Sequence, residues 1–218
     1  IRNDLLQSGA ISNMASSTFS PVYFANGNGM EWKGKDPGEI IIFRDVSVSH
    51  DFGKTIGWTV KQGRDFSRDF LTDSSAMILS ESAAKATRLA NPVGEVVQFG
   101  GKNYTIIGVV NDMLTQSPYD PVQPSIYFMD GWEGVFLIRL ALHITTAESL
   151  AKMEPVFKKY NPESPFNYKF VDDEYAKKFA NEERISSLAS FFASLAILIS
   201  CLGLFGLASF VAEKRTKE

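Results

Sequence analysis

The sequence has 218 residues, 44% of them hydrophobic, and a formal net charge of −3. This length is enough for one domain with a sizeable core or for two small domains. A small negative charge without a basic stripe argues against nucleic acid as a partner. The single cysteine, Cys201, excludes a disulfide within the chain and lies in an apolar run, where a thiol usually serves as a packing residue.

The first third of the chain predicts short elements separated by turns. Apolar residues at helical spacing, followed by Gly9, indicate a helix that ends near residue 7. β-branched runs indicate strands, and the Asn-Gly run at 26–29 is suited to a hairpin turn. After the helix, the predicted elements are strands at 10–16, 30–33 and 39–49, a helical turn that ends at Gly57, and an extended segment at 58–62.

The middle of the chain predicts a capped helix and a hairpin. Ser80 is a good N-cap for a helix over 81–89, which Asn91-Pro92 would stop. Gly100-Gly101 lies between two β-rich runs and indicates a tight turn. The predicted strands of this part are 77–79, 96–99 and 102–110.

A proline-rich connection over 113–124 precedes the last strands. Residues 135–144 alternate between one apolar side and a second side that carries Arg139 and His143. Thr145 and Glu148 fit a capping box that opens a helix to about residue 160, which Pro155 should kink or shorten. The predicted strands are 125–129, 135–144 and 167–171, and Asp172-Asp173 would cap the final helix. The apolar side of 135–144 consists of Phe136, Ile138, Leu140, Leu142 and Ile144.

Residues 185–212 are the longest apolar run, with no charged residue, histidine, asparagine, glutamine or proline. A membrane span needs about 20 such residues. Charged residues lie directly on both sides, at 182–184 and 213–215, which agrees with the cost of placing ions in lipid. The alternative is a buried core helix, but such a helix should keep one polar face, and this run has only scattered serines. Its length and place in the chain exclude a signal peptide.

Residues 173–184 predict a charged stalk helix that continues into the span. Nothing between residue 174 and Gly203 would break a helix. A rigid helix shared by two compartments can carry motion from one to the other.

Small residues recur at helical spacing inside the predicted span. The close approach of helix backbones in lipid depends on such residues, so the span is predicted to pack against other spans. The alternative is that Ala, Gly and Ser are simply common in membrane helices, and a strict G-x-x-x-G is absent. The pairs are Ala189 with Ala193, Ser190 with Ser194, Ala196 with Ser200, and Gly203 with Gly206.

The sequence predicts no catalytic, cofactor or metal site. His50 and His143 are far apart, and we expect each to be solvated or satisfied within the fold. HExxH, CxxC, Walker-type and G-x-S-x-G motifs are absent. The dispersed acids are expected to be turn residues or caps; they are Asp51, Asp65, Asp69, Asp73 and Asp112.

Several segments, in their order, resemble the MacB-type periplasmic core domain. They are GRDFS (63–67), MILSESAAK (77–85), NPVG (91–94) and YTIIGVVND (104–112). CLGLFGLA (201–208) and EKRTKE (213–218) resemble the second membrane helix and the following cytoplasmic segment of FtsX-like ABC transporter permeases, most like the Bacteroidetes branch. Each motif is weak alone, but their order and spacing make the set specific.

This resemblance implies an α+β fold and a place for each part. A porter-like, βαβ-type extracytoplasmic domain over 1–172 would consist of a frame (1–63 and 113–172) and an inserted mixed α/β subdomain (64–112). A stalk helix (173–184), a transmembrane helix (185–212) and the start of a cytoplasmic segment (213–218) would follow. Charges flank the span on both sides, so this orientation, with 1–184 outside the bacterial inner membrane, rests on the resemblance.

The resemblance also implies a non-catalytic role in an ABC permease. A separate ATPase subunit or domain would bind ATP, and its hydrolysis would move the extracytoplasmic domain to export or extract a substrate. The implied partners are that ATPase, other permease spans in a permease dimer, a periplasmic adaptor protein and membrane lipid. Two alternatives stay open: a membrane-tethered sensor that signals through its span, and a tethered enzyme, for which no nucleophile and base can be named.

Overall fold

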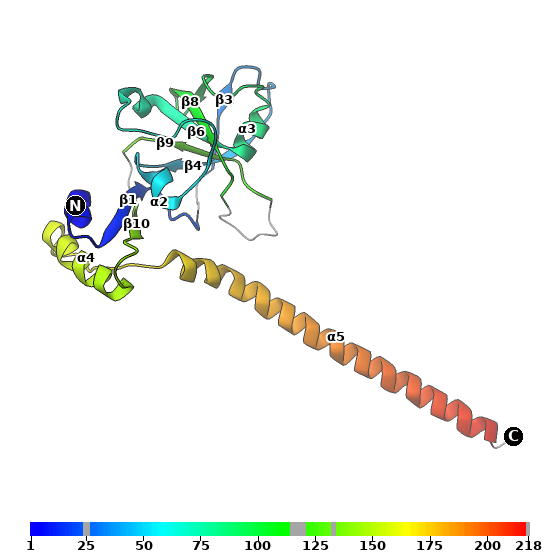
Figure 1. The fold of residues 1–218 in the computed structure, drawn as a ribbon. Helices are drawn as coiled ribbons and strands as arrows, with labels where there is room; N and C mark the ends of the chain where they lie inside the picture. The colour runs from blue at the N-terminus through cyan, green and yellow to red at the C-terminus, as the bar shows by residue number, and fades with distance from the viewer. Residues whose placement is uncertain (24–26, 114–120, 132–133, 217–218) are drawn as a thin grey trace. The chain divides into compact units, whose positions relative to one another are not determined.

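The computed structural model describes residues 1–23, 27–113, 121–131 and 134–216 (Figure 1). In the final helix it describes the side chains of 171–177 and 185–209. The chain divides into two units, Ile1–Lys169 and Phe170–Glu218, and each is described by itself. The first unit mixes helices with mostly antiparallel strand pairs, so the predicted α+β class is confirmed.

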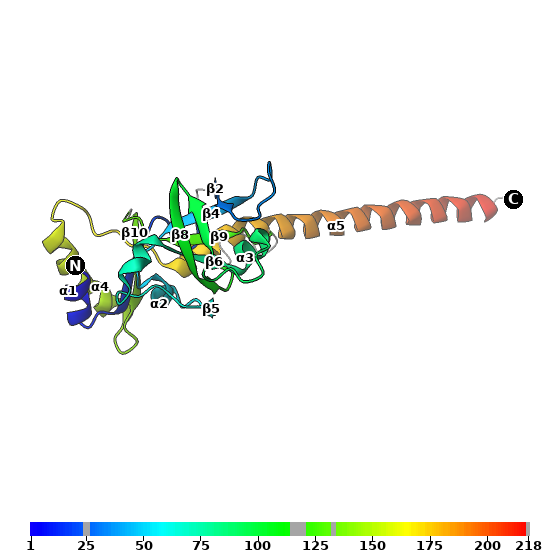
Figure 2. The same cartoon turned by 90° about the horizontal axis from the view of Figure 1, so that it is seen from above.

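The first unit contains a sheet of eight strands. Along the sheet the strands follow the order β2-β4-β9-β6-β8-β7-β3, and β5 pairs with residues 108–110 of β8. β4 is parallel to β9 and β6 is parallel to β8, whereas the other pairs are antiparallel. Figure 2 shows the sheet from above, with β8 in green. The bounds are β2 Asn28–Gly29, β3 Glu31–Trp32, β4 Ile42–Ser47, β5 Val60–Gly63, β6 Ala76–Ser80, β7 Val96–Phe99, β8 Lys102–Val110 and β9 Ser125–Phe128.

Both faces of this sheet are covered by apolar clusters. Successive side chains of a strand point to opposite faces, so neighbouring residues of one strand belong to different clusters. In β6, Met77 and Leu79 lie in one apolar cluster and Ile78 lies in the other. Ala83 of α3 (Glu81–Thr87) belongs to the first cluster, and Phe52 of α2 (Phe52–Ile56) belongs to the second. Burial on both sides explains why β6 is an unbroken apolar run rather than an alternating one.

Local signals placed the elements around β6 to β8 correctly. The Ser80 hydroxyl accepts a hydrogen bond from the Ala83 amide at 3.2 Å, as expected of an N-cap. Gly100 and Gly101 both have positive φ, 56° and 77°, in the turn between β7 and β8. Two positive φ values are what a type I′ hairpin turn requires, so the predicted hairpin is confirmed.

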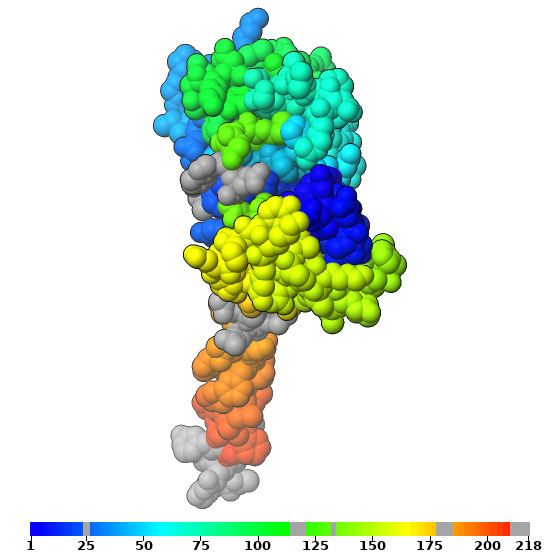
Figure 3. Space-filling model, turned by 90° about the vertical axis from the view of Figure 1, so that its left-hand side faces the viewer, coloured from blue at the N-terminus to red at the C-terminus, as the bar shows by residue number. Residues whose placement is uncertain are grey.

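A second, smaller sheet is the antiparallel pair of β1 (Ile11–Ser17) and β10 (Val135–Leu140). The helices α1 (Arg2–Gln7) and α4 (Thr146–Tyr160) pack around a core that includes Leu5, Met14 and Met153. Figure 3 shows α1, in dark blue, against α4, in yellow. The predicted capping box of Thr145 and Glu148 is present at the start of α4, and Pro155 lies inside that helix.

We call α1, β1, β10 and α4 the ribbon part, and the eight-stranded sheet with α3 the sheet part; α2 contacts both. Main-chain hydrogen bonds join the two parts where β1 ends: Thr18 N donates to Ser47 O at 2.9 Å, and Ser49 N donates to Ser16 O at 3.0 Å. Ala15 of β1 also lies in the apolar cluster that holds Ile78 of β6. The two parts therefore share a core as well as a strand junction.

The alternation predicted for 135–144 is only partly correct. β10 ends at Leu140, and Leu142 is fully exposed in the turn before α4. Leu137, on the supposedly polar side, is buried in the cluster shared with the sheet part, whereas Ile138 packs on the ribbon core. β10 therefore packs on an apolar cluster on each face. The alternation predicted the contact of one face and missed the contact that Leu137 makes on the other.

Three other predictions differ from the structure. The strand predicted at 39–49 is shorter, Ile42–Ser47, and Asn28–Gly29 pairs with it as β2 instead of forming a turn. The strand predicted at 167–171 was wrong, because 161–170 is irregular and pairs with no described strand. In this segment the rings of Phe166 and Tyr168 pack on each other, with centroids 5.6 Å apart.

The predicted subdomain 64–112 does not coincide with a break in the sheet. β6 lies inside that range and is hydrogen-bonded to β9 outside it, and β8 inside it pairs with β5, which precedes it. Residues Ile1–Lys169 form one compact unit. The division into a frame and an insert therefore stays a prediction.

The second unit is one helix, α5 (Val171–Thr216), of 46 residues. Gly203 does not interrupt it, and the backbone of residues 173–184 is helical and continuous with the apolar run. Asp172 and Asp173 lie in its first turn instead of capping it. Acidic side chains in the first turn interact favourably with the positive end of the helix dipole.

Candidate functional site

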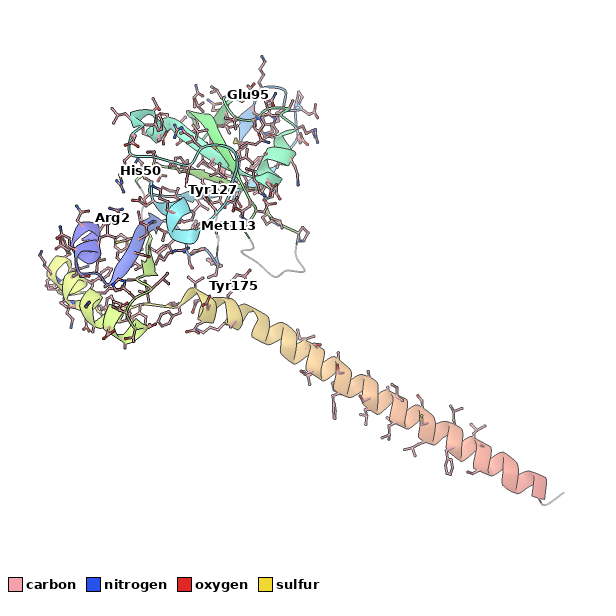
Figure 4. All side chains as sticks on the ribbon, in the orientation of Figure 1. Arg2, His50, Glu95, Met113, Tyr127 and Tyr175 are labelled. Atoms are coloured by element: carbon pink, nitrogen blue, oxygen red, sulfur yellow. The ribbon has the colours of Figure 1, made fainter. Side chains whose placement is uncertain are left out.

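Ile185–Ser209 of α5 is the one helical stretch, among the residues searched, that is long and apolar enough to cross a bilayer. Its 25 residues would span about 37 Å as a helix, compared with about 30 Å of hydrocarbon. None of its most apolar stretch is buried. This finding contradicts the alternative of a core helix and leaves the apolar side chains available to lipid (Figure 4). Residues 210–212, the end of the predicted span, are helical, but their side chains lie outside the described ones.

Five of the eight small residues that the sequence paired fall on one side of α5. Successive residues of a helix turn by about 100°, so Ala189, Ala193, Ala196, Ser200 and Gly203, at alternating spacings of four and three, form one stripe. All are exposed in this structure.

Three residues of the sequence pairs lie off this stripe. Ser190 and Ser194 lie about a quarter turn or more to one side of it, and Gly206 lies about a quarter turn to the other side. Their packing against other spans stays a prediction.

Two serine hydroxyls of the span are bonded within the helix. Ser194 Oγ donates to Ser190 O, and Ser200 Oγ donates to Ala196 O, each at 2.8 Å. A hydroxyl that donates to the carbonyl four residues earlier needs no partner from outside, which lowers its cost in lipid. These serines can therefore act as small residues.

Bulky side chains occupy the opposite side of the same stretch. They repeat with the same alternating spacing and stand out from the helix; they are Leu188, Phe191, Leu195, Leu198 and Leu202. A helix with one small side and one bulky side has two chemically different contacts available: close helix packing and lipid.

In the first unit, the polar groups singled out in the sequence hold turns and helix ends. Asp112 accepts hydrogen bonds from the amide and the hydroxyl of Ser82, at 2.9 and 2.7 Å, at the start of α3. His143 is exposed in the turn after β10, and His50 is half-buried. The described residues contain no group of three or more metal-ligating side chains.

Three acids that the sequence scattered along the chain lie near α2, in contacts that local patterns could not reveal. Asp73 is fully buried and accepts from Arg64 Nη2 at 2.6 Å and Nη1 at 2.9 Å. Asp51 binds Arg68, and Asp65 accepts from the Trp58 indole at 3.0 Å.

The two carboxylates of residues 65 and 73 have opposite electrostatic environments. Burial is the largest influence on both and acts to raise the pKa. For Asp73, the hydrogen bonds from Arg64 and from the Ser67 amide outweigh burial, so its pKa lies below the ordinary value. For Asp65, the hydrogen bonds from the Trp58 indole and the Phe66 amide do not outweigh burial, so its pKa lies above the ordinary value. Each of these carboxylates is hydrogen-bonded within the fold, so these acids serve as structural contacts.

The first unit resembles solved extracytoplasmic domains. The periplasmic region of MacB from Actinobacillus actinomycetemcomitans has 17% sequence identity and a TM-score of 0.54, over 73% of this chain and 72% of that one. The extracellular domain of the noncanonic ABC-type transporter YknZ from Gram-positive bacteria has 14% identity and a TM-score of 0.53, over 74% and 84%.

A domain of a permease protein from Porphyromonas gingivalis has 16% identity and a TM-score of 0.51, over 76% of this chain and 82% of that one. At these identities the likeness shows a shared fold. No curated protein sequence gives a significant match.

The family model described as the MacB-like periplasmic core domain matches residues 5–154. This match covers most of the first unit, from α1 to α4. The chain therefore belongs to the family of MacB-like periplasmic core domains, which are domains of ABC transporter permeases.

Proposed function

We propose that this chain is the extracytoplasmic domain and adjoining membrane helix of an ABC permease, and that it carries ATP-driven motion across the membrane to a substrate or partner outside. Its own role is non-catalytic. A separate ATPase supplies the energy and binds the nucleotide. The first unit lies outside the cytoplasmic membrane, and α5 continues through it.

One observation carries this proposal: α5 is a single helix from Val171 to Thr216. At about 1.5 Å per residue, its first 14 residues extend about 21 Å before the apolar stretch begins at Ile185. A continuous helix transmits displacement because its hydrogen bonds resist bending and stretching. A coil of the same length would absorb the displacement.

The two sides of the span support a second component of the proposal. The stripe of Ala189, Ala193, Ala196, Ser200 and Gly203 would pack closely on other spans of the permease, and the bulky side would face lipid. We propose that these spans belong to a permease dimer and that a periplasmic adaptor docks on the first unit.

The test is to soften the helix at the membrane boundary. In the complete permease with its ATPase, in lipid nanodiscs, a spin label at Leu142→Cys in each copy of the proposed permease dimer reports the distance between the two first units, in a Cys201→Ser background that removes the one thiol of this chain. One variant carries seven Gly/Ser residues between Arg184 and Ile185. Its control carries seven Ala/Glu/Lys residues, which add about two helical turns and preserve the facing of the helix.

We expect a nucleotide-dependent change in the label distance in the parent protein and in the helical insertion, and none in the Gly/Ser insertion. ATP hydrolysis by the partner should persist in all three. Full retention of the change in the Gly/Ser insertion would show that α5 does not carry the motion. Labelling of Leu142→Cys by an impermeant maleimide only after membrane permeabilisation would place the first unit on the cytoplasmic side and overturn the proposal.

A further inference from the structure

The short helix α2 lies at the junction of the ribbon part and the sheet part. Phe52 is fully buried and contacts the rings of Trp58 and Tyr127, with centroids 5.4 and 6.0 Å apart. The same cluster includes Ala15 of β1 and Leu137 of β10. α2 therefore packs on both parts at once.

The N-terminal end of α2 is bound by arginines from two directions. Asp51, the residue before the helix, accepts from Arg68 Nη2 at 2.7 Å, and Arg68 belongs to the loop that precedes β6. The same carboxylate oxygen lies 3.2 Å from Nε of Arg2 in α1, an ion pair without hydrogen-bond geometry. Asp51 is largely buried, so water screens these pairs less than pairs at the surface.

The C-terminal end of α2 is bound by an arginine from the ribbon part. Arg139 Nε of β10 donates to Thr55 O, a carbonyl of the last turn, at 2.9 Å. A cation at this end also interacts favourably with the negative end of the helix dipole. Gly57, which ends the helix with φ of 80°, leaves room for this side chain, since a Cβ there would lie 3.0 Å from Arg139 Nη2.

Trp58 and Asp65 pack against α2 at Gly53. A Cβ on Gly53 would lie 1.9 Å from Trp58 Nε1 and 2.2 Å from Asp65 Oδ2, so only glycine allows these two side chains to close over the helix. Trp58 in turn donates to Asp65 at 3.0 Å. α2 is thus held at both ends and along its side by groups from both parts.

We propose that α2 is a locking element that fixes the ribbon part to the sheet part, so that the extracytoplasmic domain moves as one rigid body. This inference rests on the proposed function and specifies how it would operate. The strand junction at Ser16–Thr18 alone could act as a hinge. With α2 in place, displacement of the ribbon part, which continues in the chain towards α5, reaches the eight-stranded sheet undiminished.

The lock can be tested in the full chain in nanodiscs without nucleotide or ATPase. Spin labels at Leu71→Cys, in the 3₁₀ turn η1 (Leu71–Ser75) of the sheet part, and at Leu142→Cys, before α4, report the distance between the parts, with Cys201→Ser as background. Both leucines are almost fully exposed, so the labels disturb no core. The test variants are Arg139→Gln and, independently, Asp51→Asn.

The matched control is Arg88→Gln. Arg88 pairs with Asp36 and Glu39 within the sheet part, so this change removes an arginine contact without touching α2. Arg139→Lys is the conservative variant, which keeps the charge at the helix end and loses the Nε donor.

We expect one narrow distance distribution in the parent and in Arg88→Gln, and a distribution at least twice as broad in Arg139→Gln and Asp51→Asn, with Arg139→Lys between them. A broad distribution in the parent would show that the parts already swing. Unchanged narrow distributions in both test variants would show that α2 does not lock them. Should one test variant fail to fold, the other decides. Because this experiment uses no nucleotide, a negative result would overturn the lock without deciding whether α5 carries ATP-driven motion, which the insertion variants test separately.

Discussion

At the scale of single residues, the contact between Arg64 and Asp73 shows how buried charge is made tolerable. Two guanidinium nitrogens and the Ser67 amide donate to one fully buried carboxylate. The Arg64 guanidinium also lies 4.0 Å above the ring of Phe70. Such a carboxylate is stable only with its partners, because a buried charge without them carries a large desolvation cost.

Asp73→Asn should lower the free energy of unfolding by about 2–3 kcal/mol at pH 7, since it leaves Arg64 without its ionic partner. The pKa of Asp73 is lowered in the folded protein, so its contribution is fully present above the unfolded pKa of about 3.9 and is lost as pH falls through the lower folded value. Urea unfolding of both proteins from pH 7 to pH 3 measures this.

The difference between the two proteins should be constant down to about pH 5 and should shrink below about pH 4. Asp69→Asn is the control, because Asp69 is exposed and bonds only locally, to Ser67. It should change stability by less than about 0.5 kcal/mol. A difference that grows as pH falls would contradict the assignment.

Residue roles were predictable only where the partner is close in sequence. Ser80 as an N-cap and the pair of Thr145 and Glu148 act within one helical turn, and the sequence identified them. Asp51 lies at the N-cap position of α2, as a turn residue or cap was expected to, but its side chain makes no cap hydrogen bond and pairs instead with Arg2 and Arg68 of other elements. No local pattern marks such a pair, because the fold brings it together.

At the scale of elements, the capping box of α4 is the clearest local signal. Thr145 Oγ1 accepts from the Glu148 amide at 3.2 Å, and Glu148 Oε2 accepts from the Thr145 amide at 3.0 Å. Thr145→Ala removes the first of these bonds and should cost about 1 kcal/mol of stability, whereas Thr145→Ser should cost a few tenths. Chemical denaturation measures both. Equal losses in the two variants would show that the hydroxyl is not the stabilising group.

The two sides of the span predict opposite responses to added bulk. Ala193→Leu places a large side chain on the small stripe and should lower the temperature at which the assembled permease unfolds in detergent. Leu195→Phe adds similar bulk on the other side and should leave this temperature within about 1–2 °C. Equal effects of the two changes would contradict the assignment of the packing side.

Elements that contact two layers were the hardest to predict. β10 is apolar on both faces because the ribbon core lies on one side and the shared cluster on the other, so its alternation was misleading. Residues 167–171 have the composition of a strand, but the ring of Tyr168 packs on Phe166, which packs in turn on Phe157 of α4. In both cases the tertiary environment decided the outcome.

At the scale of the whole molecule, the order of the strands lies beyond a reading of the sequence. β9 lies between β4 and β6 in the sheet, although more than 40 residues of sequence separate it from each of them. No local pattern in the sequence specifies these two neighbours. The class, the family and the apolar span were predictable, because composition and the order of motifs carry them. The family match over residues 5–154 confirms the resemblance.

The account depends most on α5 being one rigid helix across the membrane boundary. Spin labels at Ala176→Cys and Ala196→Cys, on the two sides of that boundary, test this in the complete permease in nanodiscs, with Cys201→Ser as background. We predict a narrow distance distribution near about 30 Å that is the same with and without nucleotide. A broad distribution, or a distance that changes with nucleotide, would show a flexible joint and contradict the mechanical role of α5.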